Sequence, residues 1–298
     1  MIALAGILIV LGAVLGGFLM ENRSLRPLMQ PAELLIIAGA GLGAMLAANP
    51  VPRLARTVRS LRGVFRSPTY SNEKYLSTLV MLYSVLYFAR HHSAGALEDA
   101  IEEPRRSALF VNQPGSAGNP EVIEFVCDTL RLSVLGAVSP YDMGVMIEND
   151  LAVRRHEGHG PVESLETLSD SLPGFGIVAA VLGVILAMGS MREAPILIGV
   201  KIAAALIGTF MGILLAYGFV SPISARIAKI ENAEAEYFES IGAGLAAFAK
   251  GVPAAIAVEC ARRAIPPEVR PDFEKTEQAC RQALHRPVEI TRPQTARY

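Results

Sequence analysis

The hydrophobic residues of this chain collect in four apolar blocks that are separated by polar sequence. The blocks lie near residues 1–20, 33–49, 172–191 and 197–220. A helix rises about 1.5 Å per residue, so roughly 20 apolar residues cross a hydrocarbon core about 30 Å thick. All four blocks are of that length, although the second is at the short limit. The pattern predicts an all-α, polytopic membrane protein with four transmembrane helices and a helical cytoplasmic domain.

Basic residues indicate the topology of these predicted spans. Residues 50–171 hold twelve Lys and Arg and the segment after residue 222 holds eleven, whereas the turns at 21–32 and 192–196 hold two and one. Positive charge stays on the cytoplasmic side of a membrane. We therefore expect a multi-pass protein of the cell inner membrane with both termini in the cytoplasm. Four regions follow: transmembrane helices 1 and 2 with a short periplasmic turn (1–49), a cytoplasmic helical domain (50–171), transmembrane helices 3 and 4 (172–222), and a cytoplasmic helical extension with a disordered tail (223–298).

Several shorter elements are predicted from local patterns. Helical spacing of apolar residues predicts helices at 75–90, 121–135 and 140–156, and the fourth span continues past Pro222 as a long helix. The run Asp170-Ser171-Leu172-Pro173 is typical of a helix start, with a capping side chain and a proline in the first turn.

Residues 53–66 form a strongly amphipathic pattern directly after the second block. Leu54, Val58, Leu61 and Phe65 share one helical face. The basic flank consists of Arg53, Arg56, Arg59, Arg62 and Arg66. The pattern favours a surface helix against anionic lipid headgroups. The alternative is a solvated helix packed on the cytoplasmic domain.

Composition narrows the function classes. The chain has 298 residues, of which 52% are hydrophobic, and a net charge of −1. This charge argues against a nucleic-acid partner. The three cysteines show no paired spacing, and neither a Gly-rich phosphate loop nor a metal-spaced cluster occurs in the sequence. We therefore expect a protein that is not an enzyme and holds no cofactor.

Polar residues within the predicted spans are the candidates for membrane chemistry. Thr209 carries the only hydroxyl near mid-depth of the third and fourth blocks, and no Asp, Glu or His lies at mid-depth of any block. Ionisable groups normally mark ion relays in membranes. If the chain conducts ions, another polypeptide must therefore supply the carboxylate. Pro173 and Pro222 either punctuate the helices or line the cytoplasmic mouth of a pathway.

Three segments carry a family resemblance. The runs QPAELLIIAGAG (30–41), DSLPGFGIVAAVLGV (170–184) and GTFMGILLAYGFVSP (208–222) resemble the MotA family of flagellar stator subunits. The resemblance implies a stator that couples proton flow to flagellar rotation. It also implies that five copies surround two helices of the partner MotB, which supplies a transmembrane Asp. Arg90, Glu98 and Asp150 match positions that meet the rotor protein FliG.

The same resemblance suggests the coupling ion. Pro173, Thr209 and Pro222 match the family's functional prolines and pore-facing threonine. Sodium-driven relatives carry extra threonines at positions that are Ala180 and Gly208 here. A dehydrated sodium ion needs several oxygen ligands, whereas a proton needs only a carboxylate and a water chain. The oxygen-poor positions favour protons.

Two alternatives to a stator remain open at the level of sequence. An energiser of the ExbB or TolQ type would power outer-membrane processes, but such proteins have fewer spans and lack the first two helices. A non-conducting membrane scaffold would also explain the Gly-rich packing faces and the missing ionisable groups. A neighbouring gene for a one-span protein with a membrane Asp would argue against the scaffold.

Overall fold

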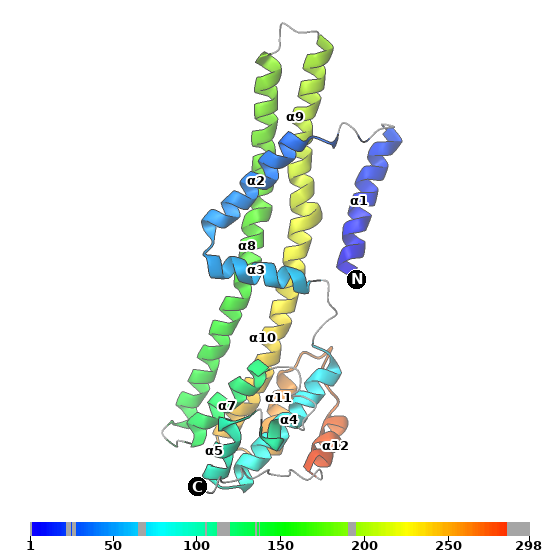
Figure 1. The fold of residues 1–298 in the computed structure, drawn as a ribbon. Coiled ribbons are helices and arrows are strands. Elements are labelled where there is room, and N and C mark those ends of the chain that lie inside the picture. The colour runs from blue at the N-terminus through cyan, green and yellow to red at the C-terminus, as the bar shows by residue number, and fades with distance from the viewer. Residues whose placement is uncertain are drawn as a thin grey trace, which may run out of the picture. The chain divides into compact units, whose positions relative to one another are not determined.

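The structure is a computed structural model that describes residues 2–21, 25, 28–64, 70–104, 106–111, 120–134, 136, 138–189 and 195–284. Within these residues every regular element is helical (Figure 1). The elements in chain order are α1 (Ile2–Glu21), α2 (Pro31–Ala48), α3 (Val51–Gly63), α4 (Asn72–His91), α5 (Ala94–Glu102), α6 (Ala108–Val111), α7 (Pro120–Val134), α8 (Pro140–Gly189), α9 (Pro195–Leu215), the π-helical turn η2 (Ala216–Val220), α10 (Ser221–Ala249), α11 (Ala254–Ala264) and α12 (Phe273–Leu284).

The chain divides into two compact units. The first unit comprises residues 1–67 and 157–231, and the second comprises residues 68–156 and 232–298. The helices α8 and α10 each contribute residues to both units. The two units are defined by contacts within the chain, whereas the four predicted regions are defined by the expected membrane spans. The boundaries of those four regions therefore stay predictions.

The first unit contains the apolar helices. Three helices are long and apolar enough to cross a membrane, namely α2, α8 and the continuous helix Ile198–Ala249. The helix α1 is apolar as well, over Ala5–Glu21. Only 11%, 22% and 17% of the residues in the three apolar windows are buried within the single chain. Such surfaces are expected where lipid or neighbouring subunits cover the helices.

The C-terminal end of the fourth predicted span is helical, as the sequence predicts. The helix α9 continues through η2 into α10, as predicted. Pro222 has no N–H to donate to the preceding turn, and its ring would clash with the carbonyl four residues earlier. The turn before it widens accordingly, and the Ser221 N–H donates to the Ala216 carbonyl five residues back.

The predicted helix start at Asp170 is wrong. The helix α8 runs without a break from Pro140 to Gly189 and contains Pro161 and Pro173 in its interior. An interior proline costs about 3 kcal/mol relative to alanine. Packing on both sides of the proline offsets this cost, because Leu172 is buried in a cluster with Ile37 and Ala216. Tertiary burial therefore outweighs the local capping signal.

The second unit is built around α4, which contacts α5, α6, α11 and α12. The predicted helices at 75–90 and 121–135 are confirmed as α4 and α7, and the segment 140–156 forms the first part of α8. Between α5 and α7, residues 105 and 112–119 lie outside the described residues, as does the whole tail at 285–298, and residues 108–111 form the short helix α6. Fully buried side chains in the core of this unit include Met81, Leu82, Val85, Leu86, Ile101, Phe110, Val126 and Tyr237.

Candidate functional site

The helices α8 and α9 approach each other closely at three glycines. A methyl group on Gly212 would lie 2.7 Å from the Leu172 carbonyl oxygen and 3.0 Å from the Gly176 Cα. A methyl group on Gly176 would lie 3.0 Å from the Gly208 carbonyl oxygen. Real Cβ atoms do not come so near to backbone atoms. Glycine at these positions is therefore what allows the two backbones to touch.

The close approach continues along the same pair of helices. A methyl group on Gly183 would lie 2.6 Å from the Ala205 Cβ. Gly208 and Gly212 on α9, and Gly176 and Gly183 on α8, therefore allow the close packing of the two helices. In contrast, no neighbouring atom lies within 4 Å of a methyl group built on Gly12, Gly16, Gly39 or Gly43. These four glycines present open faces in the single chain.

The predicted ion-pathway residues Thr209 and Ala180 lie at this crossing. A methyl group on Gly208 would lie 3.4 Å from the Ala180 backbone nitrogen and 3.2 Å from the Ala179 Cβ. Thr209 is half-buried, and its Cα would lie 3.3 Å from a methyl group on Gly176. The structure therefore brings Ala180, Gly208 and Thr209 together. It also leaves little room for a larger side chain at Gly208.

The two predicted prolines lie on adjoining segments of α8 and the π turn. The Ser169 hydroxyl, one turn before Pro173, donates to the Ala216 carbonyl oxygen at 3.4 Å. Ala216 begins the π turn that ends just before Pro222. Widened turns of this kind are frequent at functional sites. The hydrogen bond from Ser169 to Ala216 therefore connects the two segments that carry the prolines.

Glu33 is a carboxyl group that the sequence reasoning did not single out. Its Oε2 atom is buried and has no hydrogen-bond partner within the described residues. Glu33 lies in the first turn of α2, one turn before the buried Ile37. A search for acids at mid-depth overlooks it, because it stands at the edge of an apolar block. The signal that could have found it is the acid itself at the start of a spanning helix.

The three predicted rotor-facing charges all belong to the second unit and are exposed. Arg90 lies in the last turn of α4, and its Nη1 donates to the Gly251 carbonyl oxygen at 3.0 Å. Glu98 lies on α5, which begins three residues after α4 ends. Asp150 lies on α8, where its Oδ1 is 3.4 Å from the Arg154 Nε. Arg90 and Glu98 are thus joined by a short turn, whereas Asp150 comes from another helix and is already paired.

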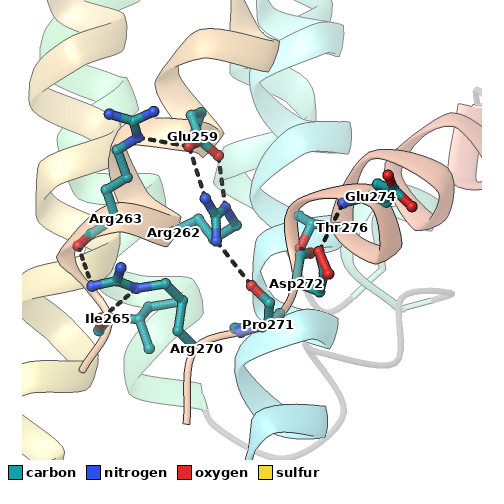
Figure 2. Close-up of polar contacts among 9 residues, drawn as sticks. All are labelled: Glu259, Arg262, Arg263, Ile265, Arg270, Pro271, Asp272, Glu274 and Thr276. Atoms are coloured by element: carbon teal, nitrogen blue, oxygen red, sulfur yellow. Dashed lines mark hydrogen bonds and ion pairs between the residues drawn. The ribbon is translucent and has the colours of Figure 1, made fainter. Parts of the chain in front are cut away.

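A polar network holds the C-terminal helices that pack on α4. Both α11 and α12 contact α4. Figure 2 shows Glu259 between two arginines, and Arg262 reaching from that carboxylate to the chain that precedes α12. Arg262 donates to Glu259 at 2.7 and 2.9 Å and to the Pro271 carbonyl at 3.0 Å. Arg263 donates to the same carboxylate at 2.7 Å. The network ties α11 to the loop that follows it, and so supports the packing of these helices on α4, which carries Arg90 in its last turn.

Acid should weaken this network. Hydrogen bonds from Arg262, assisted by those from Arg263, hold the pKa of the Glu259 carboxyl below its usual value, although partial burial opposes the shift. A lowered pKa in the folded state stabilises the fold above the ordinary carboxyl pKa, about 4.3, and the contribution is lost as pH falls through the folded value.

Glu259→Gln should therefore destabilise the protein by about 1 kcal/mol at neutral pH and by less near pH 3. The measurement is the thermal unfolding midpoint of both proteins across pH. Glu277→Gln is the control, because Glu277 forms a more exposed ion pair with Arg281 and should have little effect. If Glu259→Gln lowered the unfolding midpoint equally at every pH, the stability would not depend on ionisation of Glu259, and the prediction would be wrong.

Comparisons with known proteins match this architecture along the chain. The family model for the motility protein A N-terminal region matches residues 4–93, and the model for the MotA/TolQ/ExbB proton channel family matches residues 123–240. Motility protein A of Escherichia coli (strain K12) is 36% identical over 99% of this chain and 100% of its own length. The chain belongs to the motility protein A family. The chemotaxis protein LafT of Vibrio parahaemolyticus is 33% identical over 91% of this chain and 95% of its own length.

Solved structures share the fold of this motility protein A family member. The C. jejuni MotAB structure matches with a TM-score of 0.71 at 15% identity, covering 89% of this chain and 96% of that chain. The flagellar MotAB stator complex from Bacillus subtilis matches with a TM-score of 0.67 at 20% identity, covering 86% and 92%. At these identities the likeness concerns the fold.

Proposed function

We propose that this chain is the stator subunit of a bacterial flagellar motor. Together with a MotB-type partner it forms a proton-conducting complex of the inner membrane, and the complex converts proton flow into torque on the rotor. The observation that carries the proposal is similarity over the full length to motility protein A, at 36% identity. The ExbB or TolQ alternative is disfavoured, because the N-terminal match covers the first two apolar helices.

The ion pathway is proposed to follow the crossing of α8 and α9, with Thr209 and Ala180 on it and Pro173 and Pro222 towards its cytoplasmic end. The support is their position beside the closely packed glycines and the π turn. The spans of this chain carry no acid at mid-depth. A partner carboxylate, the transmembrane Asp of MotB, completes the pathway. Four spanning helices, cytoplasmic termini, and five copies around two MotB helices belong to the same proposal.

The rotor-facing surface is proposed to include Arg90, Glu98 and Asp150, which meet FliG. All three side chains are exposed in the second unit, as a contact surface requires. Electrostatic pairing across such an interface sets partner choice more than fold stability.

Deleting the gene tests the proposed function. Cells should keep complete flagella but lose swimming, and a plasmid copy should restore it. Outer-membrane uptake should be unchanged, which distinguishes a stator from an ExbB-type energiser. Normal swimming of the deletion strain, in the absence of a second stator set, would reject the proposal.

The coupling ion is predicted to be H⁺. Ala180 offers no hydroxyl, and a side chain at Gly208 would press against Ala179, so extra oxygen ligands for sodium have little room here. Swimming speed should be nearly independent of external Na⁺ and should collapse when a protonophore is added. A speed that rises and saturates with Na⁺, and survives the protonophore, would contradict the prediction.

A further inference from the structure

The amphipathic helix α3 lies across the long helices of the first unit, directly after α2 (Figure 1). One face is fastened to the protein. Arg53 and Arg56 form ion pairs at 3.1 Å with Glu163 and Glu157 on α8. Leu61 and Val64, at the end of the helix, pack in a small cluster with residues of α8 and α10. This face therefore has its partners within the chain.

The inner face is also fixed by Ser60. Its hydroxyl donates to the Glu231 Oε1 at 3.2 Å, and Gly158 makes room for that carboxylate, because a methyl group there would lie 3.1 Å from the Glu231 Oε2. Contacts with two different helices fix the rotation of α3 about its own axis. The outward side of the helix is therefore a defined surface.

The opposite face of α3 is basic and apolar. Val51 is 78% exposed and Val58 is 51% exposed, and Arg59 and Arg62 are also exposed. The spacing of these four residues, at positions 0, 7, 8 and 11, places them on one side of a helix. Within the described residues, no acidic side chain forms an ion pair with Arg59 or Arg62, and α3 itself contains no acid. The outer face therefore carries a net positive charge from Arg59 and Arg62.

The depth of α3 agrees with the headgroup layer of a membrane. Only Asn49 and Pro50 separate it from the apolar helix α2. Tyr217, which is 64% exposed, suits the membrane–water interface. The α10 residues that pack with α3, Ile223 and Ile227, follow Tyr217 by six and ten residues. At about 1.5 Å per residue this is roughly 9–15 Å further along the helix, where headgroups end and water begins.

We propose that the outer face of α3 binds anionic phospholipid headgroups of the cytoplasmic leaflet. Arg59 and Arg62 donate hydrogen bonds to lipid phosphate oxygens, for which the planar guanidinium is suited. Val51 and Val58 lie on the same face and contact the headgroup layer beside these arginines. Zwitterionic lipid lacks the net charge that this face complements. Lipid binding at α3 is separate from ion flow and torque, so it is measured independently of the proposed function.

The test uses the full chain purified with its MotB-type partner in neutral detergent. Phosphatidylglycerol is titrated, and the bound lipid is counted by native mass spectrometry, with phosphatidylcholine as the zwitterionic comparison. The apparent affinity for phosphatidylglycerol should fall about fivefold for each arginine removed in the Arg59→Gln/Arg62→Gln variant. The Arg59→Lys/Arg62→Lys variant should retain most of it. Arg281→Gln, a neutralised arginine on α12 of the second unit, should have no effect.

Other outcomes would overturn the proposal. Equal phosphatidylglycerol binding by the glutamine variant would do so, as would equal binding of phosphatidylcholine by the unaltered protein. Inorganic phosphate that competes with the lipid would assign the face to a free anion. A smaller assembly of the lipid-free glutamine variant would assign it to contacts between copies of the chain. The unfolding midpoint without lipid checks that the variants are folded, since both arginines are exposed.

Discussion

Gly212→Ala is expected to force α8 and α9 apart and to abolish or severely reduce swimming. The added methyl group would lie 2.7 Å from the Leu172 carbonyl oxygen and 3.0 Å from the Gly176 Cα. Both are backbone atoms, so a side-chain rotation cannot relieve the clash. Overpacking of this kind costs about 1–3 kcal/mol. This exceeds the roughly 1 kcal/mol that alanine gains over glycine by helix propensity.

Gly199→Ala is a matched control on the same helix. No atom lies within 4 Å of a methyl group on Gly199. The control should therefore keep or slightly raise the thermal unfolding midpoint, whereas Gly212→Ala should lower it. The midpoint is measured on the purified complex, and swimming is compared at matched protein levels. Similar midpoints for the two variants would show that the helices do not need to touch at Gly212.

Helices of this chain are predictable from the sequence where one periodic signal dominates. The apolar spacing of 75–90 predicts α4, and the long helix past Pro222 follows from uninterrupted helical sequence. The helix start at Asp170 fails for a physical reason. Capping residues and a first-turn proline are local signals of about 1 kcal/mol. Burial of Leu172 and the packing of Gly176 on α9 hold α8 continuous through Pro173.

The candidate site could be predicted only in part, because spacing does not reveal what a residue faces. Gly12 and Gly16 have the same four-residue spacing as Gly208 and Gly212, yet only the second pair packs within the chain. Gly176 escapes a search for spaced pairs, since its partners lie on α9. Periodicity along one helix carries no information about which helix will lie opposite. The sequence shows that small residues are present on these helices, but it does not show which residues of the other helix they contact.

The same limit applies to the rotor-facing charges. Arg90 can be recognised by family resemblance, but its hydrogen bond to the Gly251 carbonyl joins positions 161 residues apart. Gly251 has a φ of +84°, which favours glycine and ends the α10 segment in a turn. No local pattern predicts that pairing. It matters for experiment, because substitution of Arg90 removes both a charge and a structural contact.

Charge reversal at Glu98 is expected to reduce swimming sharply while the protein stays folded. Glu98 is exposed on α5, so Glu98→Lys should change the free energy of unfolding by less than about 1 kcal/mol. Across an interface, however, reversal turns attraction into repulsion. The measurements are swimming speed, membrane protein level and the unfolding midpoint. The control is the double swap Arg281→Glu/Glu277→Arg on α12, which keeps an exposed ion pair and should leave swimming intact.

Arg90 requires a comparison of two variants, because Arg90→Ala and Arg90→Glu both lose the hydrogen bond to Gly251. That loss should cost each variant about 1 kcal/mol of stability. Only Arg90→Glu adds repulsion towards an acidic partner surface. Swimming should therefore fall much further for Arg90→Glu than for Arg90→Ala, at equal unfolding midpoints. If the two variants swam equally well, the sign of the charge at position 90 would have no effect on the rotor. The role of Arg90 would then be to hold the end of α4 against Gly251.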